Sequence, residues 1–180
     1  AECVSFAELV AECTDRVAPV ESVPGSYYDG IDPASGTLQA DLSRLLERTG
    51  LDVPDLHRSI GDYIVLRDHG AMVGCIGLEV MGESGMLKDI AILPERRGEG
   101  LSWLLTDTAV RVAALRGVAR LYMFAVPHVI QTGKVLGFVP CESVEVETVV
   151  KDLRILNRSW YGQGPCLRLD LVKDEVPTEG

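Results

Sequence analysis

The sequence lacks the features that mark membrane-spanning and secreted chains. No apolar run approaches the roughly 18 residues that a bilayer-spanning helix needs, and no basic region followed by an apolar stretch opens the chain. The first residue is Ala1 rather than Met, which indicates processing or excision from a longer chain. These absences favour a cytoplasmic location and no membrane partner.

Closely spaced metal-ligand cysteines are also absent. The five cysteines are odd in number and widely separated, and no Cys-x-x-Cys pair occurs among Cys3, Cys13, Cys75, Cys141 and Cys166. This spacing excludes a zinc ribbon and a thioredoxin-like dithiol, so we expect no metal. Reduced thiols fit the cytoplasmic location.

Positive charge is scarce. The chain has 17 Lys and Arg residues against 27 Asp and Glu residues, which gives a net charge of −10. Nucleic acid is therefore excluded as a general partner, since phosphate binding needs a basic face. An acidic protein also slows the approach of an anionic cofactor. A site for such a cofactor must carry its own local positive potential.

What the sequence does contain is enough apolar material for a sizeable core. Hydrophobic residues make up 47% of the 180 positions, which suits one domain with an attached segment. We place a helical and loop extension at residues 1–60, the main domain at residues 61–172 and a tail at residues 173–180. Within the extension, Phe6–Cys13 and Leu38–Arg48 have helical spacing. The extension is either a helical substrate-side or interaction segment or a poorly ordered arm.

From residue 61 the hydrophobic pattern predicts an α+β domain with a mixed sheet. The order ββ-β-α-β-α-ββ comes from strands at Tyr63–Arg67, Ala71–Val80, Met86–Leu93, Leu121–Val126, Val144–Val150 and Cys166–Val172, and from helices at Gly98–Arg116 and Val129–Leu136.

The most informative stretch runs from Ile90 to Ser102, from an apolar strand through Pro94 into a glycine-bearing loop that opens a helix. Glycines allow several backbone amides to point at one anion, and the helix N-terminus adds roughly half a positive charge. Arg96 and Arg97 supply further positive charge. A diphosphate is the natural occupant.

Two common nucleotide motifs do not fit this stretch. Gly133-Lys134 is followed by Val135, so no Walker loop is present. Gly98-x-Gly100 is followed by Trp103, so the third glycine of a dinucleotide fingerprint is absent. An ordinary strand-turn-helix with a glycine turn remains the alternative without function.

The stretch does fit R-x-x-G-x-[G/A], with Ser102 as a small replacement at the last position, and Leu136-Gly137-Phe138 follows the second helix of the domain. Over Tyr63–Phe138 the sequence thereby resembles the GNAT acetyltransferase superfamily. Gly77-Leu78-Glu79, followed by Gly85-Met86-Leu87, is more weakly similar to its short amino-acid acetyltransferases.

The resemblance implies a GNAT-like, mostly antiparallel central sheet flanked by helices, and acetyl-CoA as co-substrate. The pantetheine would pair with the backbone of the fourth family strand, at Ile90, Ala91 and Ile92. The pyrophosphate would lie at the loop and its basic residues, Arg96, Arg97, Gly98, Glu99, Gly100, Leu101 and Ser102. The adenosine end would lie near Thr132 and Lys134.

The resemblance also shows which reactive groups are missing. The family glutamate, eleven residues before the loop arginine, falls on Met86 here, and no tyrosine occurs at Thr132-Gly133-Lys134. Glu79 is a candidate base acting through water, or a salt-bridged edge residue. His128 is a second candidate, or an exposed loop histidine.

Two functional hypotheses follow. The first is an N-acetyltransferase that moves an acetyl group from acetyl-CoA to a primary amine of a small molecule, such as an amino acid. The alternative is a non-catalytic acyl-CoA-binding regulatory module of a larger protein. For the assembly, a homodimer is an open alternative.

Overall fold

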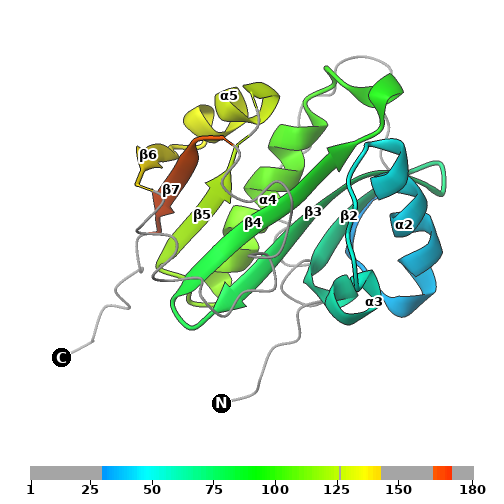
Figure 1. Cartoon of the computed structure of the whole chain (residues 1–180), viewed down its shortest axis with the longest axis horizontal. Helices are drawn as coiled ribbons and strands as arrows, with labels where there is room; N and C mark the ends of the chain where they lie inside the picture. Colours follow the sequence, from blue (N-terminus) through cyan, green and yellow to red (C-terminus); the bar gives the residue numbers. More distant parts are fainter. Residues whose placement is uncertain (1–29, 126, 143–163, 172–180) are drawn as a thin grey trace.

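A seven-stranded sheet organises the chain (Figure 1). The computed structural model describes residues 30–125, 127–142 and 164–171. The elements within these ranges are β1 (Gly30–Pro33), η1 (Gly36–Leu38), α2 (Gln39–Arg48), α3 (Leu56–Ser59), η2 (Ile60–Asp62), β2 (Tyr63–Asp68), β3 (Ala71–Met81), β4 (Ser84–Ile92), η3 (Pro94–Arg96), α4 (Leu101–Leu115), β5 (Arg120–Phe124), α5 (Pro127–Val135), β6 (Val139–Cys141) and β7 (Cys166–Asp170).

The strands follow the order β1-β2-β3-β4-β5-β7-β6. Every neighbouring pair is antiparallel except β4 and β5, which run parallel and are joined through α4. A parallel pair needs a crossover connection, and α4 provides it. The predicted α+β class and the mostly antiparallel, helix-flanked sheet are thus confirmed.

Helices cover both faces of the sheet. Figure 1 shows α2 and α3 in front of the sheet and α4 behind it. On the α4 side, a Cβ at Gly74 would lie 3.1 Å from Leu105, so the glycine allows this close approach. Apolar residues at helical spacing explain the buried side of α4, which includes Leu101, Leu104, Leu105, Ala109, Val112 and Ala113.

The structure departs from the sequence-based expectation at both sheet edges. β1 and β6 were not expected, because neither GIDP nor VPC alternates and both contain proline. Proline is tolerated in edge strands, where its missing amide costs no ladder hydrogen bond. The predicted helix Phe6–Cys13 and strand Val144–Val150 lie outside the described residues.

Residues before position 61 share the core of the sheet. β1 pairs with β2 from Gly30↔Arg67 to Pro33↔Ile64. Leu42, Leu45 and Leu46 of α2 belong to the same buried cluster as the core of β3 and α4. The domain boundaries stay a prediction, but β1 and α2 pack as parts of the sheet's own unit.

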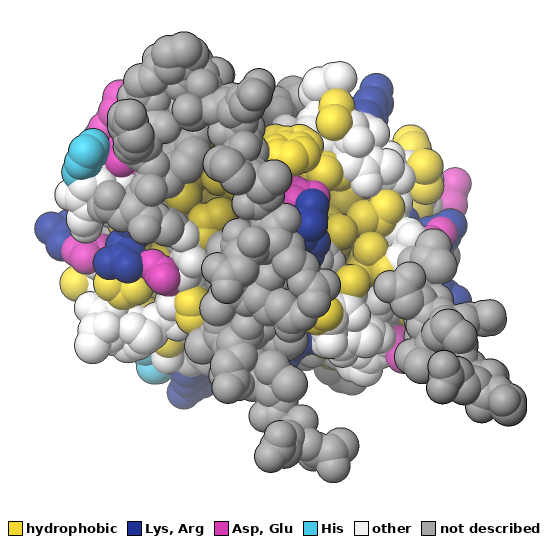
Figure 2. Space-filling view, turned by 180° about the vertical axis from the view of Figure 1, so that it is seen from behind, with side chains coloured by type: hydrophobic (Ala, Val, Ile, Leu, Met, Phe, Trp, Pro, Cys, Tyr) yellow, Lys and Arg dark blue, Asp and Glu magenta, His cyan; other side chains and the backbone are white. Residues whose placement is uncertain are grey.

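The outer surface mixes apolar and charged side chains, as the view from behind shows (Figure 2). Among the described residues, the exposed large apolar side chains are Leu115, Val135 and Val139. None of the described helices is both long enough and apolar enough to cross a membrane.

Shared packing predicts the effect of truncating α2. Leu42→Ala removes a fully buried side chain and should lower the free energy of unfolding by about 2–5 kcal/mol. Val135→Ala, at a side chain that is 64% exposed, should change it by less than about 0.5 kcal/mol. Denaturant unfolding measures both. A Leu42→Ala protein with the parent's midpoint would show that α2 is not part of the cooperative unit.

Candidate functional site

The site begins where β4 and β5 part. Their parallel pairing runs from Ser84↔Arg120 to Leu87↔Met123 and stops there. β4 continues to Ile92, and among the described residues this last part pairs with β3. The backbone groups of Ile90 to Ile92 that face β5 therefore have no strand partner among the described residues. The family resemblance predicts that the pantetheine pairs with this stretch. An extended, amide-containing chain can pair with such an edge.

A bulge marks the same part of β4. Cys75 pairs with Ala91 and Gly77 with Lys88, so β4 holds one extra residue between these pairs. Asp89 sits in this bulge with φ of +50°, a conformation that costs a non-glycine residue roughly 1–2 kcal/mol.

Side-chain contacts hold the bulge in place. The Tyr63 hydroxyl donates to Asp89 Oδ2 at 2.5 Å, and the Cys75 thiol lies 3.6 Å from the Asp89 carbonyl oxygen. Both Tyr63 and Asp89 are buried. Burial, and then the nearby charge of Asp89, raise the pKa of the Cys75 thiol. This arrangement gives Asp89 a clear structural role.

The loop after β4 presents backbone amides. Gly98 and Gly100 have φ of +85° and +79°, and α4 consequently begins at Leu101 rather than at Gly98 as predicted. Within the described ranges, the amides from Gly98 to Trp103 have no backbone acceptor, and no side chain caps the helix. Unsatisfied amides at a helix N-terminus form an anion site.

The two loop arginines differ in their surroundings. Arg96 donates to Glu99 Oε1 at 2.9 Å and to Asp68 Oδ2 at 2.6 Å, and these bonds, that to Glu99 first, raise its pKa. Two carboxylates thus neutralise Arg96, and its side chain links the loop to Asp68 at the end of β2. Arg97 is exposed and forms no ion pair with the described residues. Arg97 is the side chain available to an anion.

The other two residues predicted to bind the cofactor, Thr132 and Lys134, lie on α5. Thr132 is half-buried and Lys134 is exposed. Figure 1 shows α5 at the same end of the molecule as the first turn of α4. Gly133, between them, packs closely, since a Cβ there would lie 3.0 Å from Leu167. His128 falls in the first turn of α5, and its side chain lies outside the described residues.

Glu79 takes part in a buried ion pair. Lys88 Nζ lies 2.8 Å from Glu79 Oε2 and 3.4 Å from Asp62 Oδ2, and its side chain is only 1% exposed. Gly77 makes room for it, because a Cβ there would lie 2.6 Å from Lys88 Cγ. Sequence reasoning did not single out Lys88. A lysine at a strand position predicted to be apolar was the available signal.

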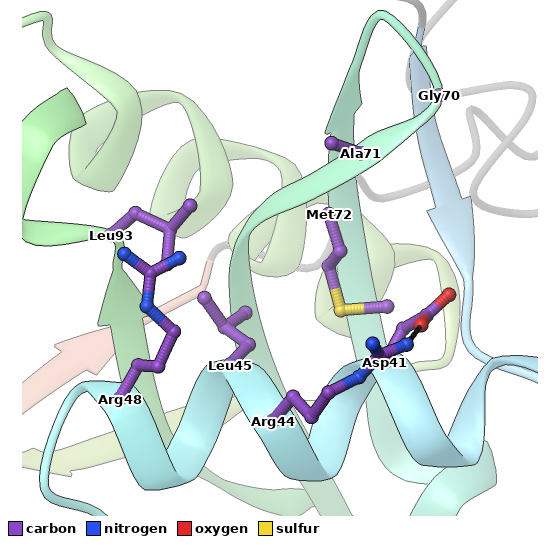
Figure 3. A pocket seen from close by; sticks show the side chains of 8 residues that line it. All are labelled: Asp41, Arg44, Leu45, Arg48, Gly70, Ala71, Met72 and Leu93. Atoms are coloured by element: carbon purple, nitrogen blue, oxygen red, sulfur yellow. Dashed lines mark hydrogen bonds and ion pairs between the residues drawn. The ribbon is translucent and has the colours of Figure 1, made fainter.

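A separate cavity of about 400 Å³ lies beside α2 (Figure 3). Its apolar floor includes Leu45, Met72 and Leu93. The rim arginines are already paired: Arg44 with Asp41, and Arg48 with Glu95 at 2.7 Å. This cavity therefore offers no uncompensated charge to an anion, unlike the amide loop. Among the described residues, no cluster of potential metal ligands is present.

Comparison with known proteins agrees with this geometry. The family described as "Acetyltransferase (GNAT) family" matches residues 38–138, more than half of the 180 residues. No curated protein sequence matches the chain.

Several solved structures share the fold. N-acetylglutamate synthase from Neisseria gonorrhoeae, complexed with coenzyme A and L-arginine, is 20% identical with a TM-score of 0.64. The match covers 81% of this chain but only 34% of that one, so this chain spans about a third of that enzyme. Rv2747 from Mycobacterium tuberculosis, in complex with CoA and NLQ, is 16% identical with a TM-score of 0.66 over 79% and 99% of the two chains.

A third structure is diaminobutyrate acetyltransferase EctA from Paenibacillus lautus, in complex with L-2,4-diaminobutyric acid and coenzyme A. It is 15% identical, with a TM-score of 0.53 over 62% of this chain and 74% of that one. At these identities the structures establish a shared fold. Together with the family match over residues 38–138, they show that the chain belongs to the GNAT acetyltransferase family.

Proposed function

We propose that the chain transfers an acetyl group from acetyl-CoA to a primary amine of a small molecule. The observation that carries the proposal is the β4 edge beyond Leu87, which has no strand partner among the described residues and leads directly to the amides at the N-terminus of α4. The three structural neighbours, each solved with coenzyme A, support the cofactor. The diaminobutyric acid in EctA supports a small amine as acceptor.

Each part of the site has a separate task. The amides from Gly98 to Trp103 and the Arg97 guanidinium would hold the diphosphate, since both complement its negative charge. The edge of β4 at Ile90–Ile92 would pair with the pantetheine amides, and Thr132 and Lys134 would lie toward the adenosine end. Acetyl-CoA supplies a thioester as acyl donor.

The chemistry then rests mainly on positioning. An N–C bond forms as the C–S bond breaks, and the amine proton must reach a base while the departing thiolate gains a proton. Met86 occupies the family's acidic position and is fully buried. Glu79 and His128 remain the proposed bases. For Glu79 this role competes with its ion pair to Lys88.

That competition favours a second candidate, a non-catalytic acyl-CoA-binding module. Thermal stabilisation by CoA, measured beside acetyl-CoA turnover on a panel of amines, separates the two. Turnover of any amine excludes the non-catalytic module. Stabilisation without turnover on the whole panel favours it, and a protein that CoA does not stabilise excludes both candidates.

Gly100→Glu tests the anion site. The glutamate would place bulk and negative charge where the diphosphate is proposed to lie, and CoA binding should be lost. Gly117→Glu is the matched control, because Gly117 ends the same helix with φ of +77° and equally open surroundings. Calorimetry should show parent-like affinity for the control alone. Equal affinities in the two variants would refute the site.

Arg97→Gln tests whether the positive charge of Arg97 contributes to CoA binding. We expect CoA affinity to fall about 10- to 100-fold, since hydrogen bonds to charged groups contribute about 1.5–3 kcal/mol. Screening should make the loss smaller at high salt. Arg111→Gln on α4, where Arg111 pairs with Asp107, removes the same charge away from the loop and should have little effect. A loss that does not depend on salt would contradict an electrostatic role.

Substitutions at Lys88 and Glu79 test whether their ion pair stabilises the fold. Lys88→Met removes the ammonium that lies 2.8 Å from the buried Glu79 carboxylate and should cost about 3–5 kcal/mol in the free energy of unfolding. Adding Glu79→Leu should restore most of that stability. Chemical denaturation measures both variants, and additive losses would contradict coupling of the pair.

The variant with both Lys88→Met and Glu79→Leu also tests whether Glu79 is the catalytic base. If Glu79 accepts the amine proton, the double variant keeps CoA affinity but loses turnover. Turnover retained with the parent's pH profile would restrict Glu79 to the ion pair and leave His128 as the proposed base.

A further inference from the structure

We propose that Cys141 and Cys166 are a redox site, at which a reversible disulfide links the edge strand β6 to β7. The two residues are direct partners in the antiparallel β6–β7 pair. Their Sγ atoms lie 2.9 Å apart, and both side chains are in the thiol form. The proposal is independent of the acetyltransferase activity.

The backbone is already suited to this bond. Directly opposed residues in antiparallel strands have Cα atoms about 4.5–5.5 Å apart, which lies inside the range of about 4.4–6.8 Å found for disulfides. Formation of an S–S bond of about 2.05 Å requires the sulfur atoms to close by only about 0.9 Å. Small side-chain rotations can supply such a movement without a change in strand register.

Accessibility distinguishes this pair from the third described cysteine. Cys141 is half-buried, so a small oxidant can reach it, whereas Cys166 is only 5% exposed. Cys75 is fully buried beneath the β4 bulge. Cys141 is therefore the point of attack and Cys166 the resolving thiol.

The reaction balances with a peroxide as the two-electron oxidant. Cys141 loses its proton, its thiolate attacks one peroxide oxygen, the O–O bond breaks, and a sulfenic acid forms while the departing hydroxide takes up that proton as water. Cys166 then loses its proton, and its thiolate attacks the sulfenic sulfur and displaces hydroxide, which takes up the second proton as a second water. In sum, two thiols and hydrogen peroxide give one disulfide and two waters. A dithiol reductant reverses the step.

The disulfide would link the shorter of the sheet's two edge strands to its neighbour. β6 pairs through only three residues, from Val139↔Arg168 to Cys141↔Cys166. Cys166 in turn pairs with Phe124, the last residue of β5. The disulfide would therefore restrain β6 and the end of β5 together, on the side where β5 has parted from β4. Segments with few buried apolar contacts open more readily than the core, and Val139 and Pro140 of β6 are exposed.

Peptide mapping of the full chain tests the proposal without any substitution. The protein is treated with hydrogen peroxide or with a reductant, alkylated and digested with trypsin, which cleaves between the cysteines at Lys151, Arg154 and Arg158. We expect the peptides of Cys141 and Cys166 to be joined after peroxide, at a summed mass lower by two hydrogen atoms. Dithiothreitol should separate them.

Thermal unfolding provides the second measurement. Closing the chain between residues 141 and 166 should raise the Tm by roughly 5–15 °C in the oxidised protein. Cys141→Ser should abolish the peroxide-dependent rise, and the matched Cys75→Ala should keep it. Both thiols fully alkylated after peroxide would overturn the proposal. Cross-links formed through Cys3 or Cys13 in place of this pair would overturn it as well.

Discussion

The early end of the parallel pairing between β4 and β5 is the constraint on which the rest of the site depends. After Leu87 and Met123 the strands share no further register, and among the described residues β4 continues with β3 as its partner. Backbone groups that lack a strand partner can pair with an extended, amide-containing ligand, so the edge at Ile90–Ile92 is suited to such a ligand. The bulge at Asp89 lies at the same place and redirects the strand.

The chain shows how an acidic protein can provide an anion site. Arg96 is neutralised by Asp68 and Glu99, so the loop's positive potential comes from its amides, from the helix that follows and from Arg97. Backbone dipoles do not depend on net charge. A protein with a formal charge of −10 can therefore keep a local positive potential at this loop.

The sequence predicted the parts of the fold and site that depend on local pattern. Apolar spacing located β2, β3, β4 and α4, and the glycines located the amide loop. Contacts between distant segments were not readable. The Lys88–Glu79 pair joins β3 and β4 above Gly77, and the Arg96–Asp68 pair joins residues 28 positions apart. Such pairs depend on register, which a bulge shifts and a single sequence does not reveal.

The close contact between Gly77 and Lys88 limits which residues can occupy these two positions. The methylene stem of Lys88 occupies the space that any side chain at position 77 would need, and the Lys88 ammonium lies 5.8 Å from the centre of the Tyr63 ring. The three positions therefore form one steric unit on three adjacent strands. Relatives with a larger residue at position 77 should carry a shorter one at position 88. We therefore expect the residues at these two positions to covary.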